Sequence, residues 1–131
     1  MTIDLWYLVA SAFWCLLLVV PIALGRIITK GGLAWGVSNR AAAFDGDPPW
    51  VGRAERAHKN MVENLAPFTA LVLVAHLAGR TGGMVPVGCA VFFWARVAHA
   101  VTYWAGIIYV RTVAFWTGVL GCLLVVYGIV G

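Results

Sequence analysis

The sequence GRAERAHKNMVENLAPF, residues 52–68, decides the fold because it carries charged groups directly into an apolar segment. Its first twelve residues include three cations and two acids, and it leads without a break into TALVLVAHLAG, residues 69–79. The polar positions recur at spacings of three and four, which places them on one face of a helix. That stripe consists of Arg53, Arg56, Asn60, Glu63 and Pro67, with Lys59 beside it.

The composition of the whole chain indicates a membrane protein. Of the 131 residues, 63% are hydrophobic and 11% are charged, and the mean hydropathy is +0.91. Soluble domains usually carry about a quarter charged residues. The length predicts one domain over residues 1–131. The net charge of +4 is too small to indicate a nucleic-acid partner, and in a membrane protein it bears first on topology.

Four apolar runs are each long enough to cross a bilayer as a helix, which takes about 20 residues. They cover about residues 5–25, 61–79, 85–105 and 112–130, and the second has a helical extension from about residue 53. No alternation of the kind found in membrane β-barrels is present in these runs. The connection over residues 26–52 is rich in turn-forming residues. The sequence therefore predicts an all-α, integral membrane bundle of four transmembrane helices.

The loop charges predict the orientation of this bundle. One side carries most of the basic residues, whereas the opposite side has only Arg80. By the positive-inside rule, the long loop faces the cytoplasm and both termini lie on the non-cytoplasmic side. The flanking basic residues are Arg26, Lys30, Arg40, Arg53, Arg56, Lys59 and Arg111.

A second polar stripe follows the third span, where Arg96, His99 and Tyr103 share one face. Glu63 and Arg96 each lie about two turns inside their helices, where a charge costs roughly 2.5–3.5 kcal/mol. We therefore expect a structural ion pair between Glu63 and Arg96. A clasp that only joins helices would balance its charges, but here cations outnumber acids. The surplus favours an anionic, peptide-like ligand.

Other kinds of site are less well supported by these residues. No second His or Cys shares the face of His99, so no metal site is expected. Asp45 and Asp47, in the sequence DGDPP, are typical of a turn. A small four-helix exporter would need an acid in mid-membrane for proton coupling, and the first span has none over residues 5–25. The roles of Arg26 and Arg40 are not predicted.

Three motifs in order resemble the MAPEG family, the membrane-associated proteins in eicosanoid and glutathione metabolism. They are RAHKNMVENLAPF (56–68), ARVAHAVTY (95–103) and VRT (110–112). The resemblance covers residues 50–115 well, and it is closest to bacterial-type members similar to microsomal glutathione transferases and prostaglandin E synthases. It implies a homotrimer of four-helix protomers in a membrane. For bacterial-type members, this is expected to be the inner membrane.

The resemblance also implies a function and a site. The function is a glutathione-dependent transferase or peroxidase that acts on lipophilic electrophiles, with glutathione as co-substrate bound between protomers near the cytosol. Arg111 matches the catalytic arginine, which stabilises the thiolate or the developing charge. The positions implied to bind glutathione are Arg56, Lys59, Asn60, Glu63, His99, Tyr103 and Arg111.

Departures from the family pattern leave a second function open. Lys59 stands where the prostaglandin synthases have an arginine, Thr112 where they have a serine, and Phe115 where they have a tyrosine. These changes argue against a prostaglandin or leukotriene product, and the residues do not identify the electrophile. The alternative is a non-catalytic member of the same fold that binds lipid or acts as a scaffold.

Overall fold

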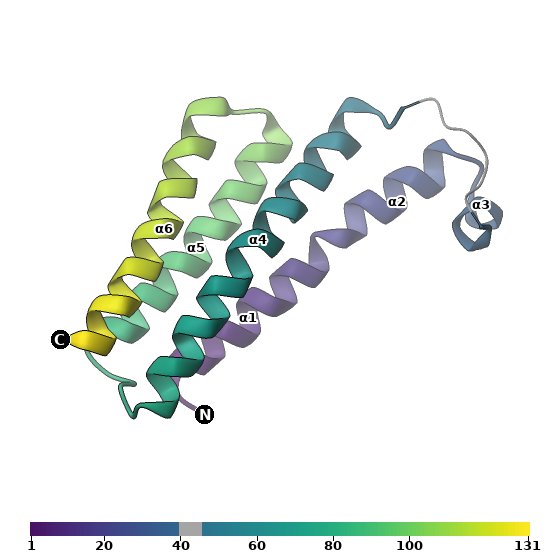
Figure 1. Cartoon of the computed structure of the whole chain (residues 1–131). Helices are drawn as coiled ribbons and strands as arrows, with labels where there is room; N and C mark the ends of the chain where they lie inside the picture. The colour runs from purple at the N-terminus through teal and green to yellow at the C-terminus, as the bar shows by residue number, and fades with distance from the viewer. Residues whose placement is uncertain (40–45) are drawn as a thin grey trace.

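The computed structural model describes residues 1–39 and 46–131, and these residues form helices and turns with no strand among them. The helices are α1 (Ile3–Leu17), α2 (Val19–Thr29), α3 (Leu33–Val37), α4 (Pro49–Leu77), α5 (Met84–Ala105) and α6 (Ile108–Val130) (Figure 1). Four segments are long and apolar enough to cross a membrane. The first is formed by α1 and α2 in succession, and the other three are α4, α5 and α6. The predicted all-α, four-span membrane fold is therefore confirmed.

The first span is divided into α1 and α2 by a local break at Leu18. Pro21 explains the position of the break, because proline has no N–H to donate to the carbonyl of Leu17 and its ring crowds that carbonyl. The described part of the predicted loop 26–52 contains more helix than expected. It includes the end of α2, the short helix α3 and the first turn of α4.

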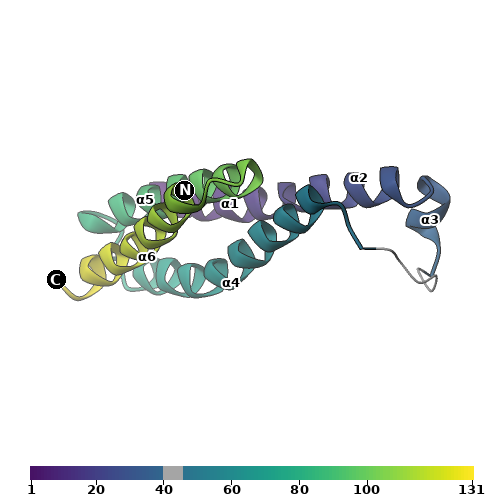
Figure 2. The same ribbon diagram turned by 90° about the horizontal axis from the view of Figure 1, so that it is seen from above.

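The helices α1, α4, α5 and α6 lie side by side, whereas α2 and α3 extend to one side of this bundle (Figures 1 and 2). Both termini lie at the same end as the turn between α4 and α5, which we call the terminal end. The turn between α5 and α6 and the start of α4 lie at the opposite end, which we call the connection end.

The core between α4 and α5 is closed by two aromatic rings. Phe68 and Phe92 are both fully buried, and their rings stack with centroids 3.8 Å apart and planes tilted by 8°.

At the terminal end, α1 contacts α4 through His76. Its Nδ1 lies 3.4 Å from a carboxylate oxygen of the fully buried Asp4 and 3.3 Å from the hydroxyl of Thr2.

The turn between α5 and α6 is set by Gly106, whose φ of +75° is the left-handed conformation that glycine adopts without strain. The amide of Gly106 donates to the carbonyl of Tyr103, and the amide of Ile107 donates to that of Thr102. This tight turn brings the last turn of α5 against the first turn of α6. It thereby positions Arg111 of α6 beside Tyr103 of α5.

Candidate functional site

A cavity of about 260 Å³ lies at the connection end between α4, α5 and α6. Four of the seven residues predicted to bind glutathione line it, and each of the three helices contributes at least one of them. Thr112 and Phe115 complete its wall. The predicted residues in this wall are Asn60, His99, Tyr103 and Arg111.

Tyr103 is the centre of the aromatic and cationic contacts in this cavity. The guanidinium of Arg111 lies 4.5 Å from the centre of the Tyr103 ring, and that of Arg56 lies 6.0 Å from it. The ring of His99 meets it edge-on, with centroids 5.5 Å apart. Cations at these distances from an aromatic face are attracted by its quadrupole. Tyr103 is therefore contacted by Arg111, which lines the cavity, and by Arg56, which lies outside its lining.

Arg96 lies directly beneath the cavity and is 1% exposed. Its Nη1 donates to Oδ1 of Asn60 at 2.9 Å, and its Nη2 donates to the carbonyl of Phe115 at 2.8 Å. A longer contact of 3.4 Å joins Nη2 to the carbonyl of Ala114. Gly118 makes room for this guanidinium, since a Cβ there would lie 2.6 Å from Nε of Arg96.

The predicted ion pair between Glu63 and Arg96 is not formed between the described residues of this chain. The two Nη atoms of Arg96 instead donate to the Asn60 amide and to the Phe115 carbonyl of α6, whereas its buried Nε has no hydrogen-bond partner among the described residues. Glu63 lies one turn further along α4 on its exposed face. The spacing placed Asn60 and Glu63 in one stripe, but only Asn60 turns toward α5 and α6.

The rest of the second-helix stripe is open to the outside of the protomer. Arg56, Lys59 and Glu63 are all exposed. A shallow groove of about 590 Å³ runs along this face and is lined by Arg56 and Lys59 together with Glu55, His58 and Val62. Glu63 lines none of the described cavities. The structure thus brings together four predicted site residues, with Arg56 at their edge, and leaves Lys59 and Glu63 on an open face.

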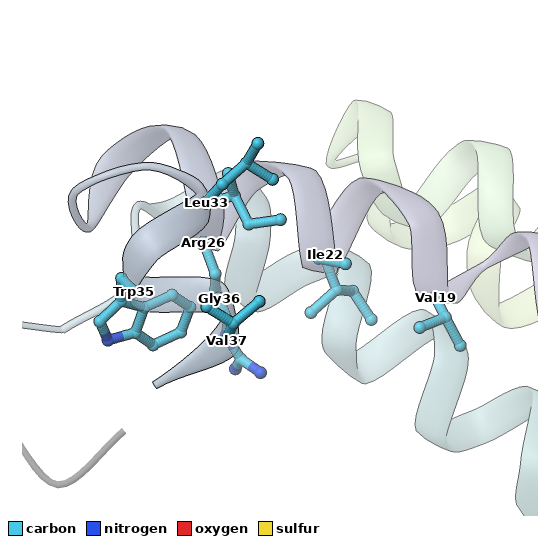
Figure 3. A pocket seen from close by; sticks show the side chains of 9 residues that line it. Val19, Ile22, Arg26, Leu33, Trp35, Gly36 and Val37 are labelled. Atoms are coloured by element: carbon cyan, nitrogen blue, oxygen red, sulfur yellow. The ribbon is translucent and has the colours of Figure 1, made fainter. Parts of the chain in front are cut away.

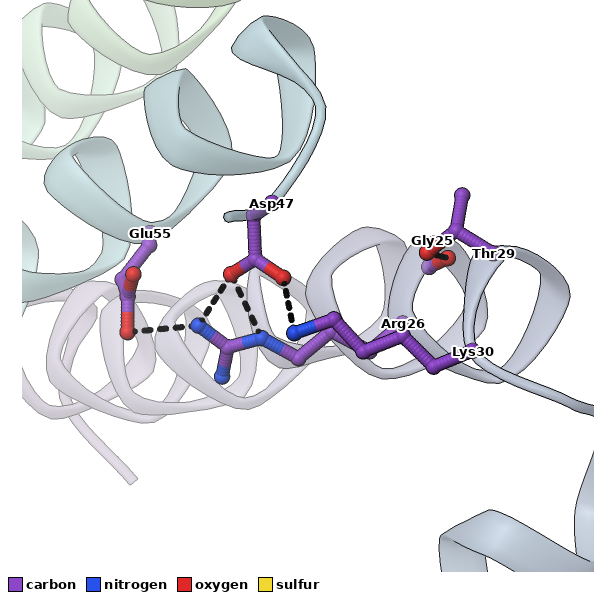
Figure 4. A network of polar contacts seen from close by, with 6 residues as sticks. All are labelled: Gly25, Arg26, Thr29, Lys30, Asp47 and Glu55. Atoms are coloured by element: carbon purple, nitrogen blue, oxygen red, sulfur yellow. Dashed lines mark hydrogen bonds and ion pairs between the residues drawn. The ribbon is translucent and has the colours of Figure 1, made fainter. Parts of the chain in front are cut away.

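A separate ionic cluster joins the end of α2 to the start of α4 (Figure 4). Arg26 donates twice to one oxygen of Asp47, at 2.7 and 2.9 Å, and pairs with Glu55 at 3.0 Å. Lys30 reaches the other Asp47 oxygen at 2.7 Å. The hydrogen bonds from Arg26, and then from Lys30, hold the pKa of the Asp47 carboxyl below its ordinary value of 3.8.

This cluster changes the interpretation of the loop. Asp47 was expected to be a simple turn residue, but its carboxylate joins the segment before α4 to Arg26 of α2 and to Lys30, which directly follows α2. Arg26 is engaged by two carboxylates and does not line the cavity of Asn60 and Arg111. Arg40 and Asp45 lie outside the described residues.

A mostly apolar cavity of about 330 Å³ lies where α3 folds back against α2 (Figure 3). Ile22, Leu33 and Val37 line it, with Trp35 and the stem of Arg26 at one side. It contains none of the residues predicted to bind glutathione. Among the described residues, no group of three or more His, Cys, Asp or Glu side chains is placed to hold a metal ion.

Comparison with known families identifies the family of this chain. The model of the MAPEG family matches residues 5–131, nearly the whole chain. The chain belongs to the MAPEG family. Membership makes it a membrane protein of the family of eicosanoid and glutathione metabolism, and confirms the resemblance seen in the three motifs. No curated protein matches this MAPEG chain significantly.

Two lining residues of the candidate cavity were not among the predicted binding residues. Thr112 and Phe115 are on the wall of the cavity. For Phe115 the available signal was its spacing from Arg111, since a position four residues later lies on the same face of α6, whereas Thr112, one residue later, is turned by about 100°. The role of Arg96 as a partner of Asn60 was also missed, although Arg96 shares a face with His99.

Proposed function

We propose that this MAPEG protein is a glutathione-dependent transferase or peroxidase that acts on lipophilic electrophiles. The observation that carries the proposal is the cavity at the connection end, where Arg111, Tyr103, His99 and Asn60 meet. Arg111 lines this cavity and Arg56 lies against the Tyr103 ring of its wall, so two cations would lie close to a bound ligand. Glutathione is a peptide-like anion and supplies the carboxylates and amides that such a wall would bind.

Arg111 is the residue proposed to activate the sulfur. A cysteine thiol has a pKa near 8.5, and an adjacent guanidinium favours the thiolate that attacks. In a transfer reaction, the thiolate sulfur forms a bond to carbon of the electrophile, and the displaced electron pair leaves with the departing group or is protonated. The lipid phase supplies the apolar substrate, and the aqueous side supplies the thiol.

A second copy of the chain is proposed to cover the exposed face of α4. Arg56, Lys59 and Glu63 are exposed in the single chain, although they lie in a segment that spans the membrane. Charges facing lipid are costly, so contact with neighbouring protomers would relieve the cost. A homotrimer with glutathione bound between protomers, facing the cytosol, fits this need. Lys59 and Glu63 would then complete the site from its open side.

The proposal is tested by the thermal stability and the turnover of the purified protein. A ligand that binds only the folded protein raises its melting temperature, so saturating glutathione is expected to raise that of the wild type. Arg111→Ala is expected to abolish conjugation of a hydrophobic electrophile while the assembly stays intact by size-exclusion chromatography. No glutathione-dependent shift in the wild type would instead favour a lipid-binding or scaffolding role, and an active Arg111→Ala protein would remove Arg111 from catalysis.

A further inference from the structure

We infer that Arg96 is a positioning residue that fixes which side of the Asn60 amide faces the candidate cavity. The inference rests on the proposed function, because it concerns how that same cavity selects its ligand. The starting point is a guanidinium that is 1% exposed and lies behind a residue of the cavity wall. From this position Arg96 can influence a bound ligand through Asn60 without contacting the ligand itself.

The orientation of the Asn60 amide follows from the chemistry of its neighbour. A guanidinium has five N–H donors and no acceptor, so the group that Arg96 meets at 2.9 Å must be the amide oxygen. Asn64 supports the same choice, since its Nδ2 lies 3.5 Å from the same Oδ1 and 2.8 Å from the Asn60 carbonyl. Rotating the amide would turn two donors toward the donors of Arg96.

The consequence is that Asn60 offers only donors to a ligand. Its oxygen Oδ1 accepts hydrogen bonds from Arg96 and Asn64. Its Nδ2 forms no hydrogen bond with another described residue. A free asparagine can match either a donor or an acceptor, whereas this one can bind only an acceptor such as a carboxylate or a peptide carbonyl. Arg96 thereby restricts the ligand groups that Asn60 can bind to hydrogen-bond acceptors.

The geometry behind Arg96 keeps it in place. Nη2 is bonded to the Phe115 carbonyl at 2.8 Å, and the side chain lies between the rings of Phe92 and Phe115, at 5.7 and 5.3 Å from their centres. Gly118 leaves the space that the guanidinium fills. The guanidinium is therefore fixed to α6 by contacts that do not depend on ligand.

The test is a double-mutant cycle on glutathione affinity, using Asn60→Ala, Arg96→Met and the double variant in detergent. If Arg96 acts through Asn60, each single variant weakens binding about tenfold and the double variant is no weaker than the worse single variant. Arg96→Lys, which keeps one donor for Asn60, is expected to recover part of the affinity. Arg53→Met is the matched control. Arg53 bonds the Trp104 carbonyl, not Asn60, so its effect should add to that of Asn60→Ala.

A second variant covers the case in which Arg96→Met does not fold. Asn60→Asp keeps an acceptor for Arg96 but replaces the donor side with oxygen, so it should fold and lose at least about tenfold in affinity. Additive effects of Asn60→Ala and Arg96→Met, or wild-type affinity in Asn60→Asp, would overturn the positioning role alone. A wild-type protein that binds no glutathione would overturn the proposed function and this inference together.

Discussion

Replacing Gly118 by alanine tests the packing that holds the buried guanidinium of Arg96. The new Cβ would lie 2.6 Å from Nε and 2.8 Å from Cζ of Arg96, and it would contact Nη2 more closely still. These separations are shorter than van der Waals contact, so the guanidinium has to move away from α6. The displaced atoms are those that bond Asn60 and the Phe115 carbonyl.

The expected cost follows from the bonds that are lost. A hydrogen bond from a charged donor contributes about 1.5–3 kcal/mol, and Arg96 makes two with short distances of 2.8 and 2.9 Å. Alanine favours the helix over glycine by about 1 kcal/mol, which offsets part of the loss. We therefore expect Gly118→Ala to lower the free energy of unfolding by about 0.5–2 kcal/mol if one bond is lost and by about 2–5 kcal/mol if both are lost.

Unfolding by SDS titration from mild detergent measures this change, and glutathione titration of the same samples measures the effect on the cavity. Gly52→Ala is the matched control. It is also a helical glycine, and its nearest foreign atom would be Nη1 of Arg56 at an ordinary 3.4 Å. It should be neutral or slightly more stable. Equal stability and equal glutathione affinity in the two variants would refute the packing of Arg96 against Gly118.

Three further changes test other contacts. Asp47→Asn should lower the melting temperature at pH 6, because the carboxylate binds Arg26 and its pKa is held below 3.8. That stabilisation is present above the ordinary pKa of the carboxyl and is lost as pH falls through the depressed pKa. The difference in melting temperature between wild type and Asp47→Asn should therefore shrink below about pH 4, and a difference that stays constant with pH would contradict the reasoning. Asp4→Ala should lower the melting temperature by releasing α1 from His76, and an unchanged melting curve would show that this contact contributes nothing. Tyr103→Phe should retain the cation contacts and leave the melting temperature unchanged, whereas Tyr103→Leu should lower glutathione affinity several-fold; equal affinities in the two variants would argue against the ring contacts.

The fold was predictable because lipid leaves few alternatives. A run of apolar residues of bilayer length has to satisfy its backbone internally, and a helix does so. The break at Leu18 and the helix over Leu33–Val37 were harder to predict. Pro21 could have indicated a kink, but a proline in a membrane helix is often accommodated without a break. The five residues of α3 are too few to show a periodicity.

The site was predictable in outline but not in its pairings. Helical spacing placed Arg96, His99 and Tyr103 on one face, and the structure brings that face against Asn60 and Arg111. Spacing gives the face of a helix only to within a few tens of degrees. It could not determine whether Asn60 or Glu63 would meet Arg96.

The ionic cluster at Asp47 was missed for a different reason. The partners of Asp47 lie at the end of α2, far from it in the sequence. A turn motif does not indicate which distant segment packs against it. Arg26 on α2 and Lys30 directly after its last residue were the available signal, since residues four apart lie on the same side of a helix.

The most direct test of the account is isothermal titration of glutathione into the purified wild-type protein and into Arg111→Ala, both in the same detergent. We expect saturable binding to the wild type, and binding at least about tenfold weaker to Arg111→Ala, because one cation of the cavity wall is removed. No heat of binding in the wild type at millimolar glutathione, or equal affinity in the two proteins, would contradict the assignment of this cavity as a glutathione site.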